Sequence, residues 1–296
     1  KKKFKGKVFY NNFSSHLCTN QFGMKISCKK EDEYKKKVYD WIFIGDSFVE
    51  GVGMDYEKTF VGIIASTRKN LKIGNLGVSS YSPSLYYLKI KNFLESGFTF
   101  KELFVFIDIS DIQDESLNAF YMDIVKNKNR VFNKNLKKAS IQGNEHLDLD
   151  QKKSIKNYIM KKFPISFQIA YNIKYYYLPK PIYRYRENYQ RSVWTYNKGL
   201  ANYDVDLGIK NSIYSMSLLH KLLKKKNIKL NLVVYPYPNQ LLYDHKNSVV
   251  TKIWKNFCYN KCYRFINLFD SFFEKEKINF KLAKKFINTY YLKGDM

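Results

Sequence analysis

The chain of 296 residues is 45% hydrophobic and 18% aromatic, so it can bury a substantial core, which excludes a disordered or fibrous protein. Its longest strongly apolar stretches, residues 41–44 and 103–109, have the length of strands and predict no membrane-spanning helix. The net charge of +26 comes from 46 Lys and only 6 Arg, and Arg is the residue that nucleic-acid readers favour. We therefore interpret the lysines as a solvated surface and expect no nucleic-acid partner.

The first half of the chain alternates between short apolar runs and helical patterns. After a basic, Asn-rich lead segment, residues 1–37, the sequence predicts buried strands at 38–44 and 71–75. A Ser-Pro pair at 82–83 starts a helix that ends at Gly97, and a third strand follows at 103–109. This β-α-β-α-β order is typical of a parallel sheet that is covered on both faces.

The second half resumes the same pattern after an interruption. Between about 114 and 203 a Lys-, Asn- and Tyr-rich stretch shows no clean period, and we interpret it as an insertion on the α/β core. The helix after Asp204 has one apolar side, formed by Ile209, Ile213, Met216, Leu219 and Leu223. A strand at 228–235, a helix at about 240–260 and a strand at 263–268 complete a predicted five-stranded parallel sheet within one domain, residues 38–296.

The four cysteines are too few for a disulfide framework. Our preferred interpretation is free, partly buried thiols, while a Cys18–Cys28 disulfide stays open for a protein outside the cytoplasm. Cys258 and Cys262 are four residues apart, and no His follows at zinc-finger spacing. The sequence therefore predicts no metal site.

Three polar segments fall at the carboxyl ends of predicted strands, where the sites of open parallel sheets collect. They are residues 45–48, 75–77 and 108–111. A serine between a strand and a helix can expose its hydroxyl and aim its N–H at a substrate oxygen, and a nearby glycine can offer a second N–H. Ser47 and Gly77 therefore predict a nucleophile beside an oxyanion hole, although Gly-Asp-Ser is also a common turn. The chain has no phosphate-binding or dinucleotide fingerprint, so we expect no cofactor.

Taken together, these blocks resemble the SGNH, or GDSL, hydrolase superfamily. Residues 43–48, with Gly51 and Gly53 behind them, are similar to its first block, and residues 75–82 are similar to the second. The third, normally Gly-x-Asn-Asp, falls on residues 108–111, where Asp108 and Ser110 replace the glycine and the asparagine. Residues 20–24 and 235–238 are similar to segments of exported bacterial members. The resemblance implies a flavodoxin-like, three-layer α/β/α sandwich.

The resemblance also implies the role of each residue. Ser47 is the nucleophile, the backbone N–H groups of Ser47 and Gly77 bind the oxyanion with help from Ser110, and Asp46 and Asp111 support them. The ending Gly294-Asp295-Met296 resembles the Asp-x-His-Trp of alginate-type O-acetyltransferases, cut one residue before its histidine. Asp295 is then the orienting acid, and we expect the base just beyond Met296.

The chain's own histidines fit that role poorly. They are interpreted as surface or packing residues: His16, His146, His220 and His245.

The sequence thus predicts a serine esterase that acts on O-acyl esters, above all O-acetyl esters of a carbohydrate. Three alternatives stay open: a polysaccharide O-acetyltransferase of the same fold, a non-catalytic glycan-binding module in which the Tyr-rich insertion stacks on sugar rings, and a basic nucleic-acid binder, which the scarcity of Arg disfavours. The expected partner is an acylated small molecule or polysaccharide. A periplasmic or membrane-anchored location, through a segment outside this sequence, is implied by the resemblance alone, and a cytoplasmic one stays open.

Overall fold

The computed structural model describes residues 3–10, 13–29, 37–117, 119–126, 191–273 and 277–291. All of them belong to one compact unit, which comprises Lys1–Lys126 and Asn188–Met296. His146, Asp295 and most of the predicted insertion lie outside the described residues. Within the described part, no helix combines the length and apolarity that a membrane span needs.

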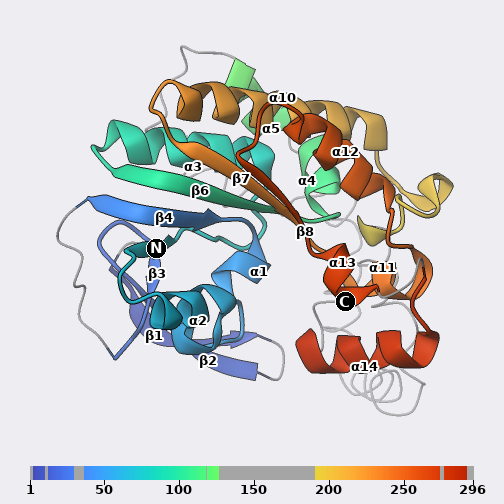
Figure 1. The fold of residues 1–296 in the computed structure, drawn as a ribbon, viewed down its shortest axis with the longest axis horizontal. Coiled ribbons are helices and arrows are strands. Elements are labelled where there is room, and N and C mark those ends of the chain that lie inside the picture. Colours follow the sequence, from blue (N-terminus) through green and yellow to red (C-terminus); the bar gives the residue numbers. More distant parts are fainter. Residues whose placement is uncertain are drawn as a thin grey trace, which may run out of the picture. The chain divides into compact units, whose positions relative to one another are not determined.

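An eight-stranded mixed sheet forms the centre of an α/β fold, with the strand order β1-β2-β3-β5-β4-β6-β7-β8 (Figure 1). Five of its strands pair in parallel: β4 (Val38–Ile44), β5 (Ile73–Asn75), β6 (Thr99–Ile107), β7 (Lys229–Val234) and β8 (Arg264–Asn267). These are the five strands that the sequence predicted, with boundaries shifted by a few residues. Their continuous apolar runs fit strands that are buried on both faces.

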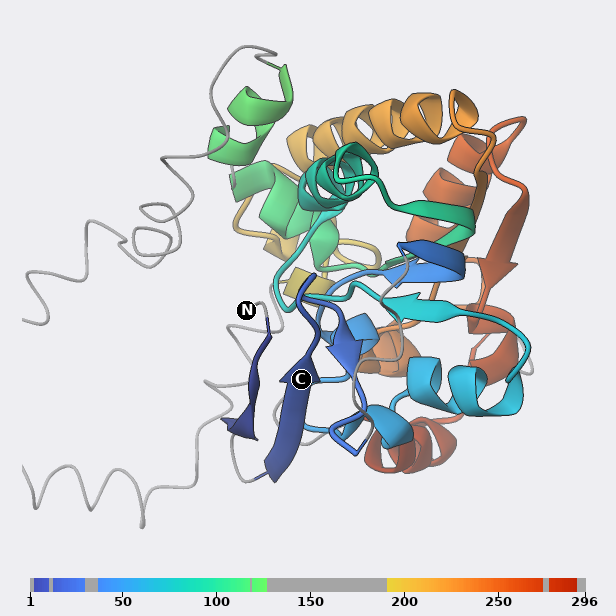
Figure 2. The same cartoon turned by 90° about the vertical axis from the view of Figure 1, so that its left-hand side faces the viewer.

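Three antiparallel strands extend the sheet at the β5 edge: β1 (Lys5–Tyr10), β2 (Phe13–Thr19) and β3 (Lys25–Ile26). Figure 2 shows β1 and β2 side by side in dark blue. The prediction assigned no strand to this lead segment, so a five-stranded sheet describes only the parallel part. The segment gave no strand signal because β1 is an edge strand whose lysines face solvent, and its pairing rests on backbone hydrogen bonds rather than on an apolar pattern.

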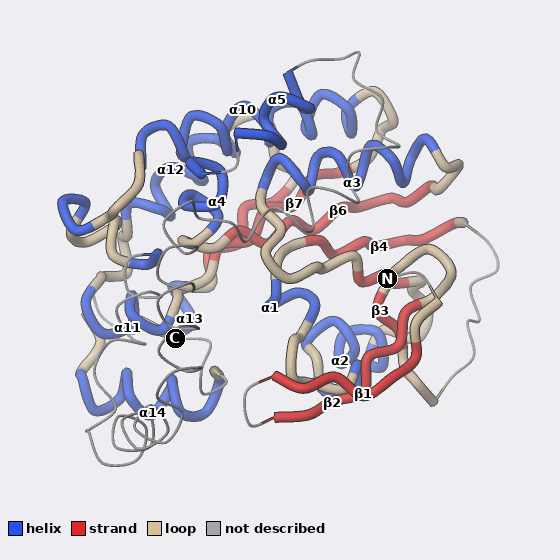
Figure 3. Tube along the Cα trace, turned by 180° about the vertical axis from the view of Figure 1, so that it is seen from behind, coloured by secondary structure: helices blue, strands red, loops and turns tan. Residues whose placement is uncertain are grey.

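Helices cover the two faces of the sheet unequally (Figures 1 and 3). One face carries α3 (Pro83–Glu95), α10 (Val205–Lys224) and α12 (Val249–Cys258), packed on a large apolar cluster. The predicted stripe of α10 is confirmed, since Met216, Leu219 and Leu223 are fully buried. The other face carries α2 (Phe60–Thr67), which packs on a smaller cluster. The short helix α13 (Phe269–Phe272) contributes Phe269 to the large cluster instead.

The remaining helices are short or lie at the ends of strands. They are α1 (Ser47–Glu50), α4 (Asp111–Leu117), α5 (Ala119–Lys126), α11 (Pro238–Tyr243) and α14 (Phe280–Tyr290), with 3-10 turns at Tyr56–Lys58 and Lys198–Leu200. The single helix predicted at about 240–260 is wrong, because α11 and α12 are separate. Asp244 ends α11, and its buried carboxylate accepts hydrogen bonds from Thr195, Gln240 and Ser248.

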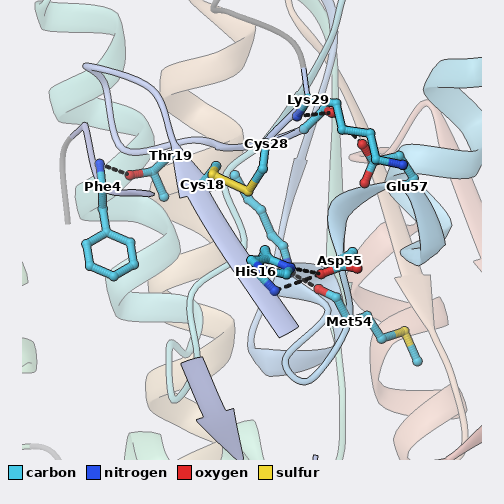
Figure 4. The surroundings of a disulfide bond; sticks show 11 residues. Phe4, His16, Cys18, Thr19, Cys28, Lys29, Met54, Asp55 and Glu57 are labelled. Carbon is cyan, nitrogen blue, oxygen red and sulfur yellow. Dashed lines mark hydrogen bonds and ion pairs between the residues drawn. A yellow bond between two sulfur atoms is a disulfide. The ribbon is translucent and has the colours of Figure 1, made fainter. Parts of the chain in front are cut away.

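The preferred interpretation of the cysteines as free thiols is wrong. Cys18 is bonded to Cys28 (Figure 4). Cys258 is bonded to Cys262, which leaves no free cysteine among the described residues. Pairing of β2 with β3 brings Cys18 opposite Ile26, two residues from Cys28, and the turn that ends α12 brings Cys262 back to Cys258. Cα–Cα separations of 5.3 and 4.7 Å suit a disulfide, and only the folded backbone supplies them.

Candidate functional site

One buried tyrosine, Tyr235, links residues that follow the carboxyl ends of β4, β6 and β7. The Tyr235 hydroxyl, just after β7, donates to Oδ1 of Asp46 at 3.2 Å and to Oδ2 of Asp108 at 3.4 Å. Asp46 follows β4 and Asp108 follows β6, and all three side chains are buried. The parallel register therefore brings together the first and third predicted segments, as neighbouring parallel strands must.

Ser47 is the first residue of α1 and is half-buried. Asp46 caps this helix by accepting the Phe48 N–H at 3.0 Å through Oδ1. The Ser47 hydroxyl has one described partner, Asp46 Oδ2 at 3.4 Å, and no described group accepts its backbone N–H. At a helix N-terminus a free N–H is a donor for an anionic oxygen, so Ser47 offers a loosely held hydroxyl beside an available donor.

Gly77 packs directly behind this segment. A Cβ at Gly77 would lie 2.3 Å from the backbone nitrogen of Glu50, so only glycine allows this approach to α1. Its N–H donates to Asn75 Oδ1 at 2.9 Å, while Asn75 Nδ2 donates to the Val49 carbonyl at 2.7 Å. The predicted oxyanion donor is thus adjacent to the nucleophile segment, but its N–H already has an acceptor.

A neighbouring amide in the loop after β5 is free instead. The Val78 N–H donates to the Gly45 carbonyl at 3.1 Å, and the Ser79 N–H donates to Glu50 Oε2 at 2.7 Å. Ser80 has a φ of +61°, and no described group accepts its N–H. The sequence analysis missed Ser80, because a left-handed φ at a serine has no sequence signal.

Ser110 is held far more tightly than Ser47. Both its N–H and its hydroxyl donate to Asp108 Oδ1, each at 2.7 Å, and the Asp111 N–H donates to the same oxygen at 3.2 Å. Ser110 is 6% exposed. Its hydroxyl proton is therefore directed at a carboxylate and not toward the space beside Ser47.

The buried acids at this edge favour their protonated forms. Burial raises the pKa of Asp46 well above its usual range, and the Asp108 charge beside it raises it further. Burial, then Asp108 and Asp46, raise the pKa of Asp111, although the Tyr86 hydroxyl donates to it at 3.1 Å and opposes the shift. Asp46 and Asp111 therefore favour their protonated forms and support this edge through hydrogen bonds rather than through charge. We call the buried side chains of Asp46, Asp108, Asp111 and Tyr235 the polar floor.

Residues that follow the undescribed stretch also dock on this edge. Arg191 pairs with Asp114 at 2.7 Å, and the Trp194 indole donates to the Ile109 carbonyl at 3.0 Å. Burial raises the pKa of Asp114 to about 6 despite the arginine. In α4, Glu115 accepts the Ser82 hydroxyl at 2.6 Å and so ties α4 to the start of α3. The sequence analysis placed Arg191 and Trp194 in the insertion and gave them no role.

None of the described histidines is hydrogen-bonded to Ser47. His16 is exposed and pairs with Asp55 at 3.4 Å, and His220 lies on α10, where burial and then Lys224 lower its pKa. His245 lies 3.9 Å from Asp244. Among the described residues no cluster of His, Cys, Asp or Glu could hold a metal ion.

An apolar groove of about 470 Å³ opens on the sheet face between α2 and α13, within the range of ligand pockets. We call it the aromatic groove; its lining includes Trp41, Phe43, Phe60, Phe104, Phe106 and Ile266. At one end the Phe48 ring lies 5.1 Å from Tyr235 and 6.0 Å from Tyr291, measured between ring centroids. The groove therefore ends at the residue after Ser47.

Comparison with known proteins adds no relative. No protein-family model matches the chain, and no curated protein matches it. Any function must therefore be argued from the site itself.

Proposed function

We propose that this protein is a serine esterase of the SGNH type that acts on O-acyl esters, in the first place O-acetyl groups of a carbohydrate. The observation that carries the proposal is the state of Ser47. Its N–H has no described acceptor, its hydroxyl has one long contact, and it starts a helix at the carboxyl edge of a parallel sheet. The first N–H groups of any helix lack an intrahelical acceptor, so the supporting feature is the position of this N–H and hydroxyl at the strand ends, where open α/β sheets bind ligands.

The strand order supports the finer fold proposal. Counted along the chain, the parallel strands β4, β5, β6, β7 and β8 lie in the order 2-1-3-4-5. This is the flavodoxin-like order, in which the connections reverse direction next to the first strand. Ser47 follows that first strand, and the reversal point is where open α/β sheets bind their ligands.

The proposed chemistry is acyl transfer through Ser47. The Ser47 oxygen forms a bond to the acyl carbon while its proton passes to a general base, for which the family resemblance implies a histidine oriented by Asp295. The leaving alkoxide takes that proton, and water then releases the acyl group from Ser47 by the reverse transfer. The Ser47 N–H stabilises the oxyanion. Gly77 and Ser110 contribute only if Asn75 and Asp108 release them.

The test is covalent labelling and acetate release by the native full-length polypeptide. An organophosphonate should modify Ser47, as located by mass spectrometry, and Ser47→Ala should abolish labelling and lower release of acetate from an acetylated xylan by about 10³-fold or more. Ser110→Ala is the matched control and should remain labelled at Ser47. An adduct at Ser110, or unchanged acetate release by Ser47→Ala, would overturn the proposal.

Two alternatives predict different results in the same assays. A polysaccharide O-acetyltransferase, favoured by the Asp-x-His-Trp-like ending, would be labelled at Ser47 but would pass acetyl groups to a sugar hydroxyl faster than to water. A non-catalytic glycan-binding module is favoured by the engaged Gly77 and Ser110 donors, and it would retain acetylated glycan without any phosphonate adduct.

The two disulfides support an extracytoplasmic location. Disulfides persist in oxidising compartments and are rare where thiols are kept reduced. We therefore propose a periplasmic or membrane-anchored location.

A further inference from the structure

The motif Asn20-Gln21-Phe22-Gly23 has a mechanical role that the proposed reaction does not use. Asn20 Oδ1 accepts the N–H groups of Phe22 at 3.0 Å and Met24 at 3.1 Å, and the Gly23 N–H donates to the Asn20 carbonyl at 2.9 Å. Asn20 is itself buried. This closed turn fixes the direction in which the chain enters β3, whose first residue is Lys25.

Lys25 is 5% exposed, which is rare for a lysine. Its ammonium donates to the Gly51 carbonyl and to the Met54 carbonyl, both at 2.8 Å. Burial lowers its pKa to about 8, while the charges of Glu50, Asp55 and Glu57 oppose that shift. A buried cation that donates to two backbone carbonyls fixes the positions of those carbonyls relative to its own strand.

The loop that Lys25 holds closes the turn of Ser47. Gly51 ends α1 with a φ of +66°, and its N–H donates to the carbonyls of Ser47 at 2.9 Å and Phe48 at 3.2 Å. The Val52 N–H donates to the Ser47 carbonyl as well, at 3.1 Å. Because α1 is only four residues long, it has little stability of its own and depends on such external contacts.

Other residues of the lead segment, residues 1–37, also form hydrogen bonds with the region just after this loop. The His16 N–H donates to Asp55 Oδ1 at 2.7 Å (Figure 4). The Ser27 hydroxyl donates to Glu57. The Cys18–Cys28 disulfide ties β2 to the segment just after β3, so Lys25 lies inside a covalently closed loop. The lead segment is thus held by contacts both before Lys25, at His16, and after it, at Ser27.

We propose that Lys25 is a positioning residue for Ser47, acting through the Gly51 and Met54 carbonyls. The clamp itself follows from the contacts above, whereas its consequence for chemistry rests on the proposed function of Ser47. Loss of the ammonium leaves the Met54 carbonyl without this donor and leaves the Gly51 carbonyl with only the Met54 N–H at 3.1 Å. The loop is then held less tightly, which widens the range of positions open to the Ser47 hydroxyl.

The first measurement is amide hydrogen exchange of the native full-length polypeptide, followed by mass spectrometry. In Lys25→Met the peptide that covers 47–54 should exchange about tenfold faster, while peptides from β6 and β7 stay unchanged. Lys25→Arg keeps charge and donors and should restore slow exchange. Lys101→Met is the matched control, because Lys101 is exposed and pairs with Asp40 at 2.7 Å far from the loop. Unchanged exchange at 47–54 in Lys25→Met would overturn the clamp.

The second measurement is the rate of phosphonate labelling at Ser47 under conditions where each variant is fully folded. Lys25→Met should react about tenfold more slowly, and Lys25→Arg should recover most of the rate. A purely structural lysine would lower the unfolding temperature but leave this rate unchanged, which would refute the positioning role. If the unmodified protein is not labelled, the proposed function fails, and hydrogen exchange still decides whether Lys25 clamps the loop.

Discussion

Ser47 and Ser110 follow neighbouring strands, β4 and β6, yet their surroundings differ in one decisive respect. The Asp46 side chain, directly before Ser47, turns back to cap Phe48 and receives the Tyr235 hydroxyl, so it touches the Ser47 hydroxyl only at 3.4 Å. Asp108, two residues before Ser110, takes both Ser110 donors at 2.7 Å.

The comparison teaches that the neighbouring carboxylate decides what a serine at a strand end can do. Where the carboxylate is occupied by the helix cap, the serine keeps a free N–H and a loosely held hydroxyl. Where the carboxylate accepts the N–H and the hydroxyl of the serine, as Asp108 does from Ser110, both donors of that serine are used in the polar floor. Substitutions at Asp46 and Asp108 should therefore differ in how far they lower the free energy of unfolding. Substitutions at Ser47 and Ser110 should differ in the same way.

The largest expected effect is at Asp108. Asp108→Ala removes the acceptor of four donors, namely the Ser110 N–H and hydroxyl, the Asp111 N–H and the more distant Tyr235 hydroxyl, and should lower the free energy of unfolding by about 3 kcal/mol. Asp108→Asn keeps an acceptor oxygen and removes a charge next to Asp46 and Asp111, so it should cost less than half as much. Urea denaturation of both variants tests this, and equal losses would show that the Ser110 turn does not depend on that oxygen.

A second effect concerns pH. Asp111 has a raised pKa in the folded protein, so between its unfolded value near 4 and the raised value the native state binds more protons than the unfolded one. Its stabilising contribution is therefore full at low pH and is lost as pH rises. The groups that face it are Asp108, Asp46, Asp114 and Tyr86.

Asp111→Asn should accordingly flatten the fall in unfolding free energy between pH 4 and 7. The slope removed is at most about 1.4 kcal/mol per pH unit, the limit for one proton. Urea titrations at several pH values measure it, with the exposed Asp270→Asn as control. If Asp111→Asn leaves the fall of the unfolding free energy with pH as steep as in the unmodified protein, a raised pKa of Asp111 is contradicted.

The smallest effect separates the two serines by stability. Ser110→Ala removes a short buried hydrogen bond and should cost about 1 kcal/mol of unfolding free energy, whereas Ser47→Ala removes only a long contact and should stay within about 0.5 kcal/mol. Thermal unfolding of the two variants side by side is sufficient. A larger loss for Ser47→Ala would mean that its hydroxyl is structural and not held ready for a substrate.

Much of this edge of the sheet was predictable from local patterns. The apolar run at 38–44 coincides with β4, and the three polar segments after the first three predicted strands do lie at strand ends. What the patterns could not give is where each hydrogen bond goes. Nothing in the sequence says that Asn75 takes the Gly77 N–H or that Ser80 is left with a free one.

The amino-acid sequence by itself determined the parallel strands, the face of α10 that meets the sheet and the polar residues after each strand, because periodicity and turn chemistry are local properties. Tertiary structure decided the three N-terminal strands, the two disulfides, the Lys25 contacts and the difference between Ser47 and Ser110. These depend on which backbone atoms come within about 3 Å of one another across long stretches of chain, and that distance exists only once the sheet has assembled.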